Sequence, residues 1–135
     1  MAEVSLVIIP ALIVGCIIGL VEMMFVHSDE IGMGWFMHGL HAFPFTVLFT
    51  FISMNVSWAL GIMPFSVPGG FFGDFAIRAV IAIIAMLKIQ TAAAIAGRVG
   101  ERFHHTFIIG VLIFLSGYVW PYIAPFVPLP KLPFF

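Results

Sequence analysis

The chain has 135 residues, of which 63% are hydrophobic, 16% aromatic and 8% charged, with a formal net charge of −1. Soluble domains contain about 25% charged residues, so the five basic and six acidic side chains of this chain are too few to coat a water-soluble globule. The composition therefore excludes a soluble domain and predicts an integral membrane protein. The lack of net positive charge argues against nucleic acid as a partner.

Four stretches of the chain are long and apolar enough to cross a membrane, which takes about 20 mostly apolar residues. They cover residues 4–26, 36–63, 75–96 and 103–122. Pro64, Pro68 and Gly69-Gly70 are expected to close the second stretch, and Pro121 and Pro125 are expected to break the fourth near Tyr122, because proline interrupts helical hydrogen bonding. Short connections make consecutive helices antiparallel. The sequence thus predicts an all-α, single-domain, multi-pass four-helix bundle in the cell membrane, with both termini on one side.

The connections at residues 27–35 and 97–102 are expected on the side opposite the termini, which we call the hairpin side. This placement brings every histidine of the chain to one membrane face, together with several carboxylates. The residues expected there are His27, Asp29, Glu30, His38, His41, Glu101, His104 and His105.

The first predicted span contains a motif of small residues that favours close helix packing. Gly15 and Gly19 are one helical turn apart, so both lie on one face of the helix. Two interpretations are open: packing inside the bundle, or a face that forms a dimer. In either case the motif is architectural.

The C-terminal segment, residues 121–135, is rich in proline and large apolar side chains. It holds five prolines and one charged residue, Lys131. The prolines exclude a regular helix, and the lack of charge excludes a solvated tail. We expect an extended segment that docks on a neighbouring subunit; the alternative is burial in the headgroup region among lipids.

Ionisable residues within membrane segments are costly and are candidates for function. Asp74 and Arg78 are spaced i,i+4 at the start of the third span, which predicts an interfacial ion pair. Lys88 lies deeper in the same span and needs a partner, for which Glu22 is the candidate. A Glu22–Lys88 pair would either fix the register of two helices or mark a path for protons or ions.

His38 and His41 are spaced i,i+3, so both imidazoles can face one side of a helix and share a metal ion. His27 and Asp29 lie just across the short connection, and such a nitrogen and oxygen donor set suits copper or zinc. The alternative is that these histidines anchor the chain at the interface. The chain contains no nucleophile elbow, haem-attachment motif, phosphate loop or H-E-x-x-H, so catalysis by this chain alone is not expected.

The segment from Val21-Glu22 through His27-Ser28-Asp29-Glu30 to His38-Gly39-Leu40-His41-Ala42 resembles small polytopic proteins that accompany membrane oxidoreductase complexes of ammonia-oxidising archaea, of the ammonia monooxygenase type. Copper-bearing subunits of that family carry Asp-x-x-x-His on membrane helices. Neither Asp29 nor Asp74 has a histidine four positions later. The resemblance therefore implies an accessory role, with copper bound on other subunits.

These observations together predict a non-catalytic subunit that packs in a larger membrane complex, with other integral-membrane subunits and lipids as its partners. One alternative is a homo-oligomeric channel or carrier that moves a proton or metal ion past Glu22 and Lys88. The other is a metal-dependent membrane enzyme that uses His38 and His41.

Overall fold

The computed structural model describes residues 6–30, 32, 34–62, 70–95 and 101–128, with the side chains of 92–95 left out. Its helices are α1 (Ile8–Asp29), α2 (Trp35–Met54), α3 (Val56–Gly61), α4 (Phe71–Ile95) and α5 (Phe103–Ile123), followed by a 3-10 turn, η1 (Ala124–Phe126). The described residues contain no strand. The prediction of an all-helical chain is confirmed.

Three of the helices are long and apolar enough to cross a membrane: α1, α2, and α5 with its continuation to Phe126. Apolar sequence favours helix here because, in lipid, every backbone N–H and C=O must be satisfied within the segment. The longest helix, α4, carries three charged residues, Asp74, Arg78 and Lys88. The predicted fourth crossing at 75–96 therefore stays a prediction.

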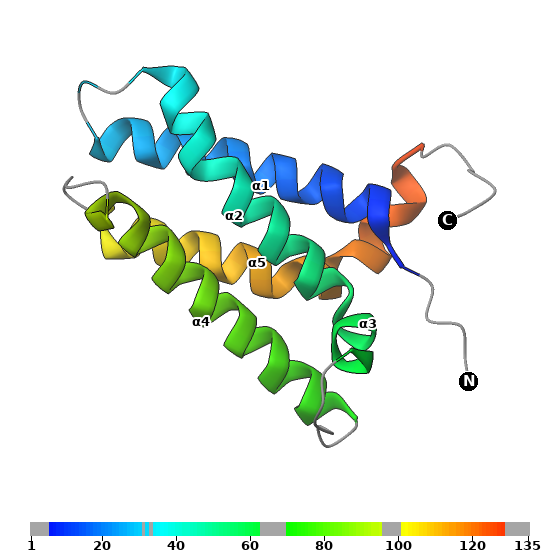
Figure 1. Ribbon diagram of the computed structural model, residues 1–135. Coiled ribbons are helices and arrows are strands. Elements are labelled where there is room, and N and C mark those ends of the chain that lie inside the picture. Colours follow the sequence, from blue (N-terminus) through cyan, green and yellow to red (C-terminus); the bar gives the residue numbers. More distant parts are fainter. Residues whose placement is uncertain (1–5, 31, 33, 63–69, 96–100, 129–135) are drawn as a thin grey trace.

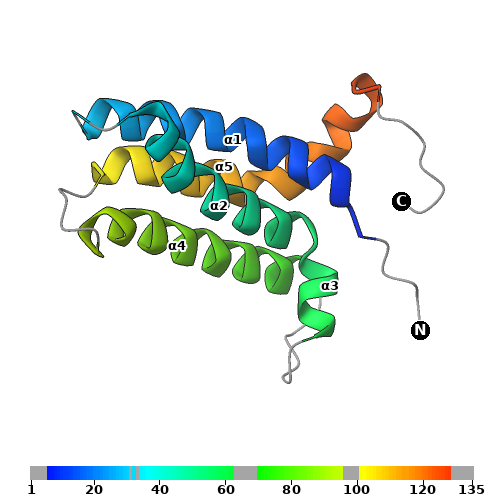
Figure 2. The ribbon, with the colours of Figure 1, turned by 45° about the horizontal axis from the view of Figure 1, so that its top comes forward.

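The four long helices lie alongside one another (Figures 1 and 2). Helix α1 packs on α2 and α5, and α4 packs on the same two helices from the other side, so the backbones of α1 and α4 do not approach each other closely in the described part of the chain. Isoleucines from three helices meet in the core, among them Ile18, Ile81 and Ile109. The end of α1, the start of α2, the end of α4 and the start of α5 share one end of the molecule, the hairpin side (Figure 1).

Gly15 and Gly19 pack inside the chain, against α2. A Cβ on Gly15 would lie 2.9 Å from the Cα of Val47, and a Cβ on Gly19 would lie 2.9 Å from the Oγ1 of Thr46. The absence of a side chain lets the two helix backbones approach closely, as small residues do in membrane bundles. Of the two interpretations open from the sequence, the structure shows internal packing at these positions.

The second predicted span, 36–63, is not one continuous helix. It divides at Asn55, where α2 ends and α3 begins. The Asn55 side chain donates to the carbonyl oxygen of Phe51 (2.9 Å) and accepts from the backbone N–H of Val7 (2.7 Å). Asn55 therefore ties the end of α2 to the segment that leads into α1.

Replacing Asn55 with alanine should loosen this connection and lower the free energy of unfolding by about 1–2 kcal/mol, because the buried Val7 N–H loses its acceptor. Amide hydrogen exchange at Val7 should accelerate in the variant. Ser57→Ala, at an exposed position of α3, is the matched control and should leave both quantities unchanged. If amide exchange at Val7 were unaltered in Asn55→Ala, the hydrogen bond between Val7 and Asn55 would not be what protects this amide.

Helix α5 ends at Ile123, one residue after the predicted end of the fourth span at Tyr122, although Pro121 itself does not interrupt the helix. Helix α5 continues through Pro121 to Ile123 and passes into η1, and its last part bends away from its first part (Figure 2). Proline inside a helix bends the axis and removes one hydrogen bond without always ending it. Of the predicted extended tail, 121–135, residues up to Phe126 are thus helical or 3-10, and residues 129–135 lie outside the described part.

Candidate functional site

Glu22 lies on the buried face of α1. The buried residues of this helix repeat at helical spacing and include Gly15, Gly19, Glu22 and Val26. Gly15 and Gly19 bring α2 close to α1. The side chain of Glu22 lies on the same face of α1, three residues after Gly19, and is therefore enclosed between helices. Glu22 is accordingly only 1% exposed, which is unusual for a carboxylate in any protein.

The carboxyl group of Glu22 lies within hydrogen-bonding distance of the carboxyl group of Glu101, which precedes α5. Glu101 is 7% exposed. Both oxygens of Glu22 and the Oε2 of Glu101 are buried, and no N–H or O–H group of the described residues donates to them. Two ionised carboxylates can only accept, so this contact becomes a hydrogen bond only when one of them carries a proton.

A second polar group lies beside this pair and joins α1 to α5. Asp29 Oδ2 is 2.7 Å from the Nδ1 of His105 and accepts from the backbone N–H of Arg102 at 3.0 Å. The Arg102 guanidinium lies 3.4 Å from the other oxygen of Asp29 and is largely exposed. The ring of His105 also stacks on Phe25. Asp29 therefore ties the end of α1 to the start of α5 through Arg102 and His105.

The environment of Glu101 opposes its ionisation. Burial raises the pKa of Glu101 from 4.5 to about 10, and the neighbouring carboxylates of Glu22, Asp29 and Glu30 act in the same direction. Desolvation and like charges both favour the neutral form of a carboxyl group. Because the two carboxyls are coupled, the proton belongs to the Glu22–Glu101 pair rather than to one residue.

Replacing Glu101 with glutamine should flatten the dependence of stability on pH. With its pKa raised, Glu101 makes the folded chain bind a proton more tightly than the unfolded chain. The resulting stabilisation is complete below about pH 4.5 and is lost as the pH rises toward about 10, with a slope of at most about 1.4 kcal/mol per pH unit. Unfolding free energies measured across this range in detergent should fall with pH in the wild type and vary less in Glu101→Gln. If the unfolding free energy changed with pH equally in the wild type and in Glu101→Gln, the raised pKa of Glu101 would be contradicted.

The predicted metal ligands are not gathered into one site. His38 is fully buried, and neither of its ring nitrogens has a hydrogen-bond partner among the described residues. Its ring lies edge-to-face with the ring of His27, with 5.0 Å between the ring centroids. His41 is half-buried, and Asp29 is held by His105 on the side of α5. Among the residues that the structure describes, no three His, Cys, Asp or Glu side chains are placed to hold a metal ion.

The predicted Glu22–Lys88 pair is wrong. Lys88 is exposed on α4, whereas Glu22 is buried on α1. The backbones of these two helices do not approach each other closely within the described chain, because α2 and α5 lie between them. The carboxyl that meets Glu22 comes instead from the residues that lead into α5.

The predicted Asp74–Arg78 pair is present. Arg78 Nε lies 2.8 Å from Asp74 Oδ2, and the Tyr118 hydroxyl donates to the same oxygen at 2.6 Å. The Arg78 guanidinium also donates to the carbonyl oxygen of Ser53 and lies over the Tyr118 ring. A Cβ on Gly117 would overlap this guanidinium. The network joins α2, α4 and α5 at the end opposite the hairpin side.

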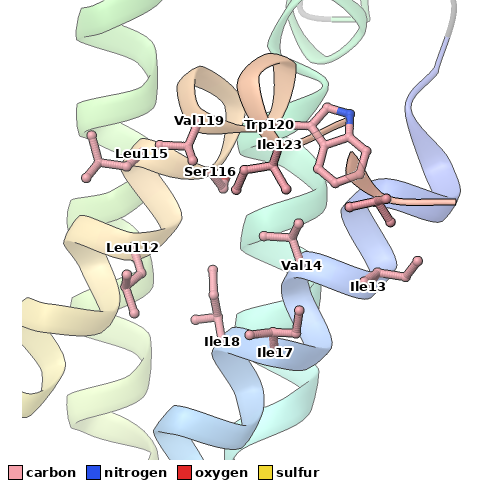
Figure 3. A pocket seen from close by; sticks show the side chains of 11 residues that line it. Ile13, Val14, Ile17, Ile18, Leu112, Leu115, Ser116, Val119, Trp120 and Ile123 are labelled. Atoms are coloured by element: carbon pink, nitrogen blue, oxygen red, sulfur yellow. The ribbon is translucent and has the colours of Figure 1, made fainter. Parts of the chain in front are cut away.

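An apolar groove of about 300 Å³ lies between α1 and α5. Figure 3 shows Val14, Ile17 and Ile18 of α1 on one side of it, and Leu112, Leu115 and Val119 of α5 on the other. Ile123 and Val127 continue its lining beyond Pro121. We call this feature the α1/α5 groove.

Sequence reasoning placed Glu101 and His105 on the hairpin side but assigned them no partner. Their roles depend on α5 lying next to α1, and no local pattern encodes that neighbour. The one available signal was the spacing of Glu22 from Gly15 and Gly19, which puts its carboxyl on the packing face. Tyr118 was likewise missed as the third member of the Asp74–Arg78 network.

Comparisons of the chain with protein-family models, with curated proteins and with solved structures found no match.

Proposed function

We propose that this chain is a non-catalytic subunit that packs against the helices of other proteins within a membrane complex. The observation that carries the proposal is the α1/α5 groove, whose lining is apolar and which nothing in the described chain fills. Beside it, Tyr122 and Phe126 are 80% and 85% exposed. A groove edged by exposed aromatic side chains is the kind of surface that another helix covers.

In this proposal α4 is the fourth crossing and both termini share one side of the membrane. Its 25 residues span about 37 Å as a helix, which exceeds a hydrocarbon core of about 30 Å. The Asp74–Arg78 pair is neutral as a unit, and the exposed Lys88 can extend its stem toward the interface.

The resemblance of residues 21–42 to accessory proteins of archaeal membrane oxidoreductases extends the proposal to a copper membrane monooxygenase of the ammonia monooxygenase type. The copper would be bound on other subunits, since this chain lacks Asp-x-x-x-His. The chain would contribute packing surface to that assembly.

Photo-crosslinking in native membranes tests the proposal. A photoreactive residue at Ile17 or Leu115, both in the groove, should give discrete adducts with a different polypeptide. The matched control is Ile83, an exposed isoleucine of α4 that lies outside the groove, and it should give mainly lipid adducts. Native mass spectrometry after gentle extraction should show the same partner.

Two outcomes would overturn the proposal. Adducts of the groove positions with lipid alone would show that acyl chains fill the groove. Adducts only with further copies of this chain would favour the homo-oligomeric channel or carrier instead.

A further inference from the structure

Among the described residues, no lysine or arginine side chain pairs with Glu22 or Glu101. Arg78 pairs with Asp74 at the opposite end, Arg102 lies against Asp29, and Lys88 is exposed. The described residues also offer no third ligand that would complete a metal site here. Two negative charges would therefore face each other in a medium of low dielectric, where their repulsion and desolvation are strongest.

We propose that Glu22 and Glu101 form a proton-binding site that holds one exchangeable proton between their two carboxyl groups at neutral pH. One carboxyl is then the donor and the other the acceptor, which gives the buried oxygens a donor that the described residues do not otherwise supply. The pair carries a single negative charge. Neither residue needs a metal ion or a basic side chain to remain buried.

The groups around the pair decide how the proton enters. His105 of α5 and Asp29 of α1 act electrostatically on Glu22, and Glu30 acts on Glu101. Helix α2 carries His38 and His41 in its first half, and α4 carries Lys88, which is exposed. Of these, His105 is partly exposed, interacts with Glu22, and is held in place by Asp29.

The pair exchanges its proton with water at the hairpin side. One of the two carboxylates takes a proton from water, and the pair changes from two negative charges to one. Release of the proton to water reverses this step, so the charges balance in each direction.

Infrared spectroscopy of the full chain in lipid nanodiscs tests the proposal. A protonated carboxyl has a C=O stretch that is distinct from the bands of an ionised carboxylate. The wild type should show this band at neutral pH, and the band should shift on transfer to D2O. Glu22→Gln and Glu101→Gln should each abolish it, because the remaining carboxylate can then accept from the glutamine amide and needs no proton.

Asp74→Asn is the matched control, since Asp74 is ionised beside Arg78, and it should leave the band intact. The two glutamine variants are independent, so loss of fold in one, judged by circular dichroism, leaves the other as a test. A wild type without the band, a band that survives both variants, or a band that grows when sodium or calcium is removed would overturn the proposal.

Discussion

Replacing Asp74 with alanine should destabilise the folded chain by about 2–3 kcal/mol, because it leaves the charge of Arg78 without its counterion. Only 12% of the Arg78 side chain is exposed, so water replaces the lost carboxylate poorly. The Asp74 side chain is 32% exposed, which keeps the expected loss below the full value for a buried pair. Unfolding in mixed micelles with increasing SDS would measure it.

Two further variants distinguish two causes of the lost stability: the unpaired charge of Arg78 and the lost hydrogen bonds of Asp74. Asp74→Asn keeps an oxygen that can accept from Tyr118 and from Arg78, so it should cost less than Asp74→Ala. The double variant Asp74→Ala with Arg78→Met removes the unpaired charge and should recover part of the stability. A double variant as unstable as Asp74→Ala would show that the charge is not the cause.

The three helices that are long and apolar enough to cross a membrane were predictable from the sequence, because lipid imposes a simple rule on it. Each crossing needs an unbroken apolar run, and such runs are visible in any window of suitable length. The internal breaks were not predictable. Asn55 ends α2 while it binds Val7, 48 residues away, and Pro121 is accommodated within α5. Both results depend on tertiary neighbours and not on local composition.

In the candidate site, too, contacts within one helix were predictable from the sequence, and contacts between helices were not. The Asp74–Arg78 pair needs only the geometry of one helix, so the i,i+4 spacing predicted it. The partner of Glu22 depends on which helices flank α1, and the sequence does not state their order around the bundle. Lys88 was predicted as the partner because its depth in the membrane matches that of Glu22. The helices that carry these two residues, α4 and α1, do not approach each other closely.

Gly15→Val should separate α1 from α2 and lower the free energy of unfolding by about 2–3 kcal/mol. Even the Cβ alone would lie 2.9 Å from the Cα of Val47, and backbone cannot move aside as a flexible side chain can. The two γ-methyl groups of valine add to this overlap. Gly15→Ala should therefore have a smaller effect of the same sign, about 1–2 kcal/mol, after allowance for the better helix propensity of alanine.

Gly110→Ala is the matched control for this prediction. A Cβ there would meet the Cγ and Sδ of Met86, which belong to a flexible side chain that can change rotamer. Its cost should be below about 1 kcal/mol, and the gain in helix propensity should offset part of it. If Gly110→Ala proved as damaging as Gly15→Ala, close approach of the α1 and α2 backbones would not be the reason for glycine at position 15. Disulfide trapping between cysteines placed on α1 and α2 would then show whether the two helices remain adjacent.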